Sequence, residues 1–235
     1  MTQGAAWFVI GTDTEIGKTL VSAALLHALA LRGVRAAGIK PVAAGATWRD
    51  GAWHNEDADM LAANAGVELP LELLTPCLLR QPMAPHIAAE LELHRIDLPH
   101  LRACYDQVAA MADAVVVEGV GGFRVPLTDG ADTADMAVQF GLPVIMVVGL
   151  RLGCLSHALL TAEAVAARGL DLVGWVANTV DADMLQIQAN IDALQQRLPA
   201  PLLGVVPRLA IADAAHAAAY LDFSCLPGWT AGRAQ

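Results

Sequence analysis

The stretch WFVIGTDTEIGKTLVSAALLHALALR, residues 7–32, joins a short apolar run, a glycine-bounded loop and a segment with helical apolar spacing. This order is typical of a phosphate-binding P-loop, in which a strand, a loop ending in Gly-Lys-Thr and a helix follow one another. Backbone N–H groups of such a loop bind phosphate oxygens at the positive end of the helix. Lys18 would then reach the β and γ oxygens and the Thr19 hydroxyl could bind Mg²⁺. Gly11 and Gly17 enclose five residues instead of the usual four, yet the layout still predicts ATP binding.

The rest of the chain alternates short apolar runs with longer helical patterns, which is typical of a parallel sheet covered on both faces. The expected strands are Trp7–Ile10, Ala36–Pro41, Ala114–Glu118, Val144–Val148, Leu172–Asn178 and Leu202–Val206. The expected helices are Gly17–Arg32, Asp57–Asn64, Leu98–Met111, Thr133–Phe140, Ser156–Arg168 and Asp183–Arg197. No repeat or linker interrupts the pattern. We therefore expect an α/β fold of the P-loop NTPase-like, doubly wound kind, forming a single domain over residues 1–235.

Charge and composition exclude several classes of protein. The 235 residues include 14 Lys+Arg and 24 Asp+Glu, a net charge of −10. Phosphate backbones and anionic lipid surfaces attract proteins with surplus cations, so nucleic-acid and membrane binding are not expected. The four cysteines form no CxxC pair, the N-terminus has no basic leader, and the apolar runs fall short of the roughly 20 residues that span a bilayer. We expect a cytoplasmic protein with reduced cysteines.

Polar side chains follow several of the predicted strands, at the edge where open α/β sheets bind their ligands. Lys40 precedes Pro41 at the end of the second strand and could face a reaction that develops negative charge, although a surface lysine is the simpler alternative. Glu118 closes the third strand, where P-loop proteins place a Mg²⁺ ligand. Gly121-Gly122 follows and permits either close approach to a ligand or a tight turn.

The acidic segment from His54 to Asp59 contains Glu56, Asp57 and Asp59 directly before an apolar-periodic helix. Helix capping and the helix dipole explain such a cluster without any function. Alternatively, one of these carboxylates completes an oxygen-rich Mg²⁺ site with Thr19 and Glu118. The residues alone leave both explanations open.

Taken together, the motifs resemble the dethiobiotin synthetase family. The similarity runs from about Trp7 to Pro207, and the five-residue gap in the P-loop is itself the form found in that family. The matching segments are GTDTEIGKT at 11–19, GIKPV at 38–42, VEGVGG at 117–122, PVIMVVG at 143–149, LGC at 152–154, GWVAN at 174–178 and PLLG at 201–204.

The resemblance implies an ATP- and Mg²⁺-dependent ring closure in biotin synthesis, from 7,8-diaminononanoate and CO₂ to dethiobiotin, ADP and phosphate. One nitrogen of the diamine captures CO₂ as a carbamate, ATP phosphorylates the carbamate oxygen, and the second nitrogen closes the cyclic urea. This chemistry needs no protein nucleophile. It needs cations around oxygens that gain charge.

Site residues follow from the resemblance position by position. Thr14, Lys18 and Lys40 would be catalytic, contacting the carbamate or the transferred phosphoryl group. Thr19, Asp57 and Glu118 would hold Mg²⁺. The nucleotide would contact Glu15, Gly17, Lys18, Thr19, Asn178 and Pro207, with Asn178 at the adenine edge and Pro207 near the same ring. The substrate would contact Thr14, Lys40, Glu118, Gly121, Leu152, Gly153, Cys154 and Ser156.

The segment 152–156 opens a predicted helix whose free N–H groups suit an anion, although capping by Ser156 would explain it equally well. In the family this segment binds the substrate's tail across a dimer interface, so the resemblance implies a homodimer. Two departures stand out. Ala44 replaces a hydroxyl residue, and the segment after Pro207 lacks an acid that the family can place near the nucleotide.

Two rival functions remain on the residues alone. A partition or septum-positioning ATPase switch would share the fold, but such proteins usually carry a further lysine early in the loop, and Lys18 is the only lysine between Gly11 and Thr19. An ATP-dependent ligase acting on a larger acid, such as a corrin ring, would belong to the same superfamily. This chain is short for that reaction and shows no glutaminase-like segment.

Overall fold

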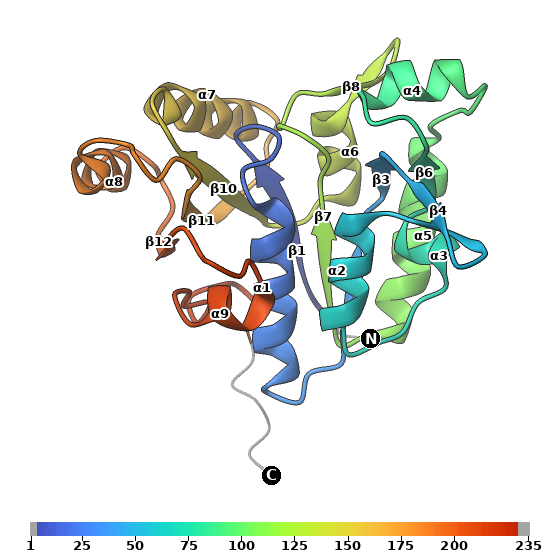
Figure 1. Ribbon diagram of the computed structural model, residues 1–235, viewed down its shortest axis with the longest axis horizontal. Coiled ribbons are helices and arrows are strands. Elements are labelled where there is room, and N and C mark those ends of the chain that lie inside the picture. The colour runs from blue at the N-terminus through green and yellow to red at the C-terminus, as the bar shows by residue number, and fades with distance from the viewer. Residues whose placement is uncertain (1–3, 230–235) are drawn as a thin grey trace.

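The computed structural model describes residues 4–229 and contains a six-stranded parallel sheet at its centre (Figure 1). The strands lie in the order β12-β11-β10-β1-β7-β2. Their bounds are Ala5–Gly11 for β1, Ala36–Ile39 for β2, Ala114–Glu118 for β7, Val144–Leu150 for β10, Leu172–Thr179 for β11 and Leu202–Val206 for β12. Each expected strand is therefore present, and the α/β P-loop fold is confirmed.

Alternate side chains of β1 enter two separate hydrophobic cores, which explains why its sequence is apolar without a break. Trp7 and Val9 pack into one core, and Phe8 and Ile10 pack into the other. A strand that is buried on both faces loses the polar-apolar alternation of a half-exposed strand. The continuous apolar runs of the sequence are thus the direct result of a sheet covered on both sides.

Helices cover both faces of the sheet, as the sequence predicts. The face of Trp7 is covered by α1 (Lys18–Ala30), α2 (Glu56–Asn64) and α9 (Ala214–Ala218), which stand in front of the sheet in Figure 1. The face of Phe8 is covered by α5 (Leu98–Met111), α6 (Thr133–Phe140), α7 (Cys154–Ala167) and α8 (Ile187–Gln195). None of the helices within residues 4–229 is long and apolar enough to cross a bilayer.

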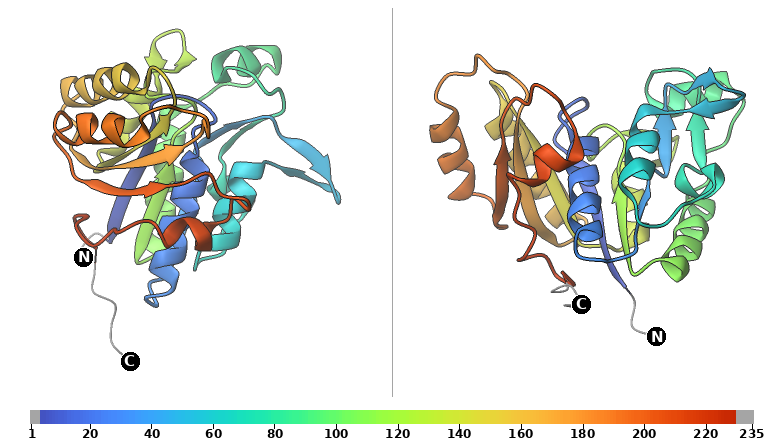
Figure 2. Two further views of the ribbon diagram at one scale, coloured as in Figure 1. Left: turned by 60° about the vertical axis from the view of Figure 1, so that its left-hand side comes forward. Right: turned by 60° about the horizontal axis from the view of Figure 1, so that its bottom comes forward.

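Several short elements are absent from the sequence-based prediction. They are β3 (Val42–Ala44), β4 (Thr47–Arg49), β5 (Ala52–His54), α3 (Leu71–Leu74), β6 (Cys77–Leu79), α4 (Pro85–Leu91), β8 (Pro126–Thr128), β9 (Ala131–Asp132) and α9. Each is too short to show a period. The β4–β5 hairpin, which extends from the body of the protein in Figure 2, turns at Asp50 and Gly51, with φ of 52° and 82°. Two positive φ values suit an Asp-Gly hairpin turn, a signal that the sequence does carry.

Some predicted boundaries were wrong by a few residues. The second strand ends at Ile39, which leaves Lys40 just outside it. The helix expected from Ser156 begins at Cys154, because Gly153 with φ of 97° is its N-cap and no side chain caps it. Capping by Ser156 is therefore excluded. The helix expected from Asp183 begins at Ile187.

Helix α1 begins at the end of the P-loop, and the packing of this helix against the sheet can be tested. Leu25 is 0% exposed in α1, whereas Leu31 at the C-cap of the same helix is 76% exposed. We expect Leu25→Ala to lower the free energy of unfolding by about 2–5 kcal/mol, because it leaves a cavity in the core. Leu31→Ala is the matched control and should change it by no more than about 0.5 kcal/mol. Denaturant unfolding measures both, and equal effects would contradict this packing.

Candidate active site

The carboxyl ends of the six parallel strands meet at one edge of the sheet, and the predicted site residues gather there. The P-loop follows β1, Lys40 follows β2, and Glu118 is the last residue of β7. The remaining predicted residues lie at the ends of other strands: Gly121 follows β7, the segment 152–156 follows β10, Asn178 lies near the end of β11 and Pro207 follows β12. Because the strands are parallel, their ends bring together residues that are more than 180 positions apart in sequence.

The shape of the P-loop leaves little room for a side chain at either of its two glycines. Gly17 has a φ of 90°, and a Cβ there would lie 2.2 Å from Nδ2 of Asn178. A Cβ at Gly11 would lie 2.8 Å from the carbonyl oxygen of Asp13. Glu15 adopts a φ of 54° and is exposed, as is Thr14. The loop thus holds a strained conformation that leaves the side chains of Thr14 and Glu15 free to face a ligand.

Asn178 is bound to the P-loop. Its Nδ2 donates a 2.8 Å hydrogen bond to the carbonyl oxygen of Ile16, and the residue is 7% exposed. Pro207 directly follows Val206, which is the register partner of Asn178 in the sheet. The two residues expected near adenine therefore lie at neighbouring strand ends. The bond to Ile16 shows that Asn178 also supports the loop itself, a role that the sequence does not reveal.

Lys40 lies between two carboxylates at the centre of the site. Its Nζ is 2.5 Å from Oε1 of Glu118 and 2.8 Å from Oδ2 of Asp57, and it donates a 3.1 Å bond to the carbonyl oxygen of Gly119. The Thr19 Oγ1 lies 2.7 Å from Oδ1 of Asp57 and 2.8 Å from Oε1 of Glu118. Lys40 is 2% exposed, so the alternative of a surface lysine is excluded. The structure thus brings together the side chains that sequence reasoning placed in one site.

The two lysines of this site have opposite pKa shifts. Burial lowers the pKa of Lys40, but the nearby charges of Glu118 and Asp57 outweigh it and raise the pKa above the ordinary value. Burial, together with the charge of Lys40, lowers the pKa of Lys18 to about 8. Lys18 is 6% exposed and its Nζ donates to the carbonyl oxygen of Asp13 at 3.0 Å. The sequence contains no other lysines, so both amino side chains of the protein lie here.

The oxygens of the site fit a hard divalent cation. Oε2 of Glu118 is buried and has no hydrogen-bond partner within residues 4–229. A buried, unpartnered carboxylate oxygen beside the Thr19 hydroxyl and a second carboxylate matches the few protein ligands by which Mg²⁺ is held next to phosphates. In the described part of the chain, no group of three or more His, Cys, Asp or Glu side chains could hold a metal ion by itself.

The acidic residues in the first turn of α2 have different partners in the structure, which shows which of them belongs to the site. Asn55 is the N-cap, and its side chain accepts from the N–H of Ala58 while donating to the carbonyl oxygen of Ala44. Asp57 faces Thr19 and Lys40. Asp59 pairs instead with Arg49 and His54. Capping therefore belongs to Asn55, which we did not single out although Asn is a preferred N-cap residue, and Asp57 alone of the acids joins the site.

The segment expected to bind the substrate's tail is only partly free. Leu152 is 94% exposed and Ser156 is exposed, but Cys154 is 1% exposed and its N–H donates to the carbonyl oxygen of Arg151 at 3.0 Å. Cys154 thus offers no free polar group in this conformation. The amides of Leu155 and Ser156, in the first turn of α7, have no acceptor within the helix.

Arg151 adds a cation that sequence reasoning missed. Its guanidinium pairs with the carboxylate of Asp13 in the P-loop, and the same carboxylate accepts the N–H of Thr14 at 2.8 Å. The pair joins positions 138 apart, and no local pattern in the sequence signals it. It links the loop after β10 to the front of the P-loop.

Several known proteins are similar to this chain in sequence. A family model described as an AAA domain matches residues 5–216. A protein of Janthinobacterium sp. (strain Marseille), named ATP-dependent dethiobiotin synthetase BioD, is 66% identical over 233 residues, covering 97% of this chain and 99% of the relative. A protein of Aromatoleum aromaticum with the same name is 58% identical over 228 residues, covering 97% of this chain and all of the relative.

Solved structures that resemble this chain are distant in sequence. The septum site-determining protein MinD from Pyrococcus horikoshii, complexed with Mg-ADP, matches with a TM-score of 0.56 and 19% identity over 88% of this chain and 82% of that protein. A ParA family ATPase from Chlorobium tepidum matches with a TM-score of 0.52 and 15% identity, over 88% and 85% of the two chains. These similarities establish the fold alone. The two close relatives in sequence, which this chain matches over nearly its whole length, establish that it belongs to the ATP-dependent dethiobiotin synthetase family.

Proposed function

We propose that the cluster of Lys18, Lys40, Thr19, Asp57 and Glu118 is where this protein closes the cyclic urea of dethiobiotin. The protein is an ATP-dependent ligase that joins CO₂ to 7,8-diaminononanoate, as its family membership establishes. The observation that carries the assignment to this cluster is the buried Lys40 ammonium, held within 2.8 Å of two carboxylates beside a P-loop. A cation fixed in this way suits a reaction in which oxygens gain charge.

The reaction balances without a protein nucleophile. One amine of the substrate attacks CO₂ and loses a proton to form a carbamate. A carbamate oxygen attacks the γ-phosphorus of ATP, which breaks its bond to ADP and gives a carbamic-phosphoric anhydride. The second amine attacks the carbonyl carbon, phosphate leaves with the bonding electrons, and the amine proton is lost. The protein's part is to hold the reactants in line and to stabilise the charged oxygens.

The two lysines divide this work. Lys18 lies in the P-loop, where it would contact the β and γ oxygens of the nucleotide. Lys40 is bound to Glu118 and Asp57 and would contact the carbamate and the phosphoryl group in transit, as would Thr14 of the P-loop. Gly121 would offer its backbone to the substrate. Ala44 offers no hydroxyl, and its carbonyl oxygen is already bound by Asn55, so water or other backbone groups must replace that contact.

Thr19, Asp57 and Glu118 would hold Mg²⁺. The unpartnered Oε2 of Glu118 supports this assignment, as does the approach of both carboxylates to the Thr19 hydroxyl. When bound, the metal ion supplies positive charge to the phosphate oxygens. Glu15 and Gly17 would complete the nucleotide site at the P-loop, with Asn178 and Pro207 near the base.

A homodimer would complete the substrate site. The exposed Leu152, the first turn of α7 and the hydroxyl of Ser156 form a surface that could receive the carboxylate at the far end of the diamine. In this arrangement each site draws on both chains. Cys154 would contribute through its place in the turn, because its side chain is buried.

The overall assignment has a simple test. ADP release by the purified protein should require both CO₂ and 7,8-diaminononanoate, and mass spectrometry should detect dethiobiotin. A nucleotide-driven switch, the alternative that the MinD-like fold raises, would hydrolyse ATP with or without the diamine. Diamine-independent turnover would therefore contradict the proposed function.

The Mg²⁺ site predicts a difference between two neighbouring aspartates. We expect Asp57→Asn to raise the Mg²⁺ concentration for half-maximal activity by at least about tenfold, the scale on which even the loss of an outer-shell partner acts. Asp59→Asn is the matched control, because Asp59 lies in the same helical turn but pairs with Arg49 and His54. Titration of activity against Mg²⁺ at fixed ATP distinguishes them. An equal shift in both variants would remove Asp57 from the metal site.

The low pKa of Lys18 predicts a pH dependence of ATP binding. Below about pH 8 Lys18 is charged and attracts phosphate oxygens, and above this value it is neutral, so ATP affinity should fall as the pH rises through 8. Lys18→Arg stays charged and is the control, whose affinity should not fall over the same range. Dissociation constants measured from pH 7 to 10 test this, and identical profiles would show that Lys18 is not the group that titrates.

The tail site predicts an effect of charge at Ser156. An acid in the first turn of α7 favours the helix, so Ser156→Asp should fold normally. It should nevertheless raise KM for the diamine by at least about tenfold, because two like charges would meet. Ser156→Asn, of similar size and uncharged, should change KM little. Steady-state kinetics give both values, and a normal KM for the aspartate variant would exclude Ser156 from the tail site.

The same variant tests the shared site. Mixing Ser156→Asp chains with Lys40→Ala chains and allowing exchange gives dimers in which, if sites are shared, one site has both defects and the other has neither. Turnover at low diamine should then exceed the average of the two unmixed preparations. If each site lies within one chain, every site keeps one defect and turnover stays at that average, provided that labelled chains confirm the exchange.

A further inference from the structure

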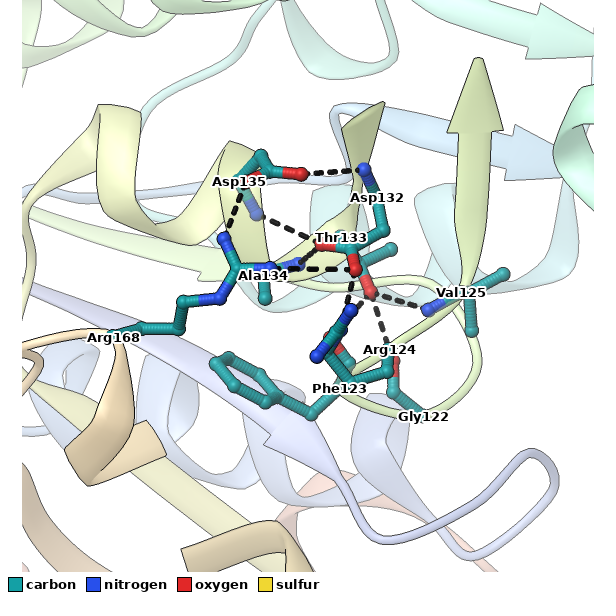
Figure 3. Close-up of polar contacts among 9 residues, drawn as sticks. All are labelled: Gly122, Phe123, Arg124, Val125, Asp132, Thr133, Ala134, Asp135 and Arg168. Carbon is teal, nitrogen blue, oxygen red and sulfur yellow. Dashed lines mark hydrogen bonds and ion pairs between the residues drawn. The ribbon is translucent and has the colours of Figure 1, made fainter. Parts of the chain in front are cut away.

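Thr133, the first residue of α6, is bound to the backbone of the loop that follows β7. Its Oγ1 lies 2.7 Å from the carbonyl oxygen of Phe123 and 3.2 Å from that of Gly122, and it accepts the N–H of Val125 at 2.9 Å. Its own N–H donates to the carbonyl oxygen of Val125 at 2.9 Å. Thr133 is 3% exposed. Figure 3 shows its hydroxyl at the centre of these contacts.

The other side of the same loop lies against the P-loop. The N–H of Gly119 donates to the carbonyl oxygen of Val9 at 2.9 Å, in the strand β1 that leads into the P-loop. A Cβ on Gly122 would lie 3.9 Å from Cα of Asp13 and from the carbonyl oxygens of Gly11 and Thr12. Gly121 has a φ of 61°, a conformation that glycine adopts easily. The loop 119–125 is therefore held between Thr133 and the P-loop, directly after the buried Glu118.

Charged side chains fix the turn that presents Thr133. Asp132 caps α6 by accepting the N–H groups of Ala134 and Asp135, and Asp135 accepts the N–H of Asp132 in return. Arg168, at the C-cap of α7, pairs with Asp135 and lies 3.6 Å from Asp132. Arg124, from the loop itself, pairs with Asp132. These contacts, drawn in Figure 3, tie the loop to two helices.

We propose that Thr133 is a positioning residue for the reaction, and that Asp132, Asp135 and Arg168 support it by fixing the start of α6. The inference rests on the proposed function, which places Gly121 against the substrate. The segment from Gly119 to Phe123 includes three glycines and so has much conformational freedom, which the Thr133 hydroxyl restricts. Thr133 touches no reactant. It acts by fixing the backbone that must meet the carbamate beside the P-loop.

The test compares Thr133→Val, which keeps the shape and loses the hydroxyl, with Thr133→Ser, which keeps the hydroxyl. Misplacement of the loop in the valine variant should lower kcat by on the order of 10- to 100-fold. Its dissociation constant for ADP should stay at the wild-type value, because the P-loop is intact. Thr133→Ser should restore most of kcat. A valine variant with normal kcat, or a serine variant as slow as the valine variant, would overturn the proposal.

A general loss of stability must be separated from loop positioning. Leu194 is 0% exposed and belongs to α8, outside the loop and outside the two helices α6 and α7 that are tied to it, so Leu194→Ala is the destabilised control. Its kcat at the assay temperature should stay normal. Hydrogen exchange of residues 119–125 should speed up in Thr133→Val and remain slow in Leu194→Ala. If both variants lose kcat alike, or if exchange in the loop is unchanged in Thr133→Val, the proposal fails.

Arg168→Met provides a second, milder variant if Thr133→Val does not fold. It should lower kcat in the same direction with an unchanged dissociation constant for ADP, and a wild-type kcat would overturn the proposal in that case. Failure of the proposed function itself would look different. The wild-type protein would then form no dethiobiotin, whereas failure of this inference leaves the wild-type activity intact.

Discussion

The buried ammonium of Lys40, held between Glu118 and Asp57, is the interaction on which the rest of the site depends. Removing a charge from water costs several kcal/mol even after the protein relaxes, so it persists only where opposite charges and hydrogen bonds replace the solvent. Glu118 ends β7, Lys40 follows β2, and Asp57 comes from α2. The neighbouring strands β7 and β2 bring Glu118 and Lys40 together. Asn55 caps the N-terminus of α2 and so fixes the turn from which Asp57 extends. Core packing of the sheet and its helices is thus what allows these charges to be buried.

Charge balance explains how such a cluster can accept a nucleotide. Lys18 and Lys40 carry positive charge when protonated, Asp57 and Glu118 carry negative charge when ionised, and together they sum to about zero. Burial beside Lys40 lowers the pKa of Lys18, so its positive charge is held at a cost in the ligand-free protein. Phosphate oxygens beside Lys18 relieve that cost, which favours their binding at this end of α1. Within residues 4–229 the Oε2 atom of Glu118 has no hydrogen-bond partner, and a divalent cation bound beside it would supply the interaction that this buried oxygen lacks.

Much of this arrangement could be predicted from the sequence, because each central strand is a continuous apolar run and each key polar residue follows one of these runs. Lys18, Lys40 and Glu118 could be placed at one edge on that basis alone. The residues alone did not choose Asp57 over Asp59, since both lie in one helical turn. The family resemblance pointed to Asp57, and tertiary packing shows that it is the one that faces Thr19. The ion pair between Arg151 and Asp13 could not be predicted either, because a contact between residues 138 positions apart produces no local sequence pattern. The short elements between 42 and 91 were not predicted for a related reason, since elements this short show no period and are held in place by their neighbours. The exception is the β4–β5 hairpin, whose Asp-Gly turn is a recognisable local signal.

The same fold supports proteins with different functions, and the residues at the strand ends decide among them. MinD and ParA proteins match this chain with TM-scores of 0.56 and 0.52, yet they share only 19% and 15% of its residues. A switch needs its nucleotide site to change the shape of a surface, whereas a ligase needs it to face a second reactant. Lys40 follows β2 and the loop 119–125 follows β7, both on one side of β1, and the proposed function places the second reactant against them. If Thr133 holds this loop as we propose, the loop would align a small molecule with the phosphoryl group, an arrangement that suits a ligase.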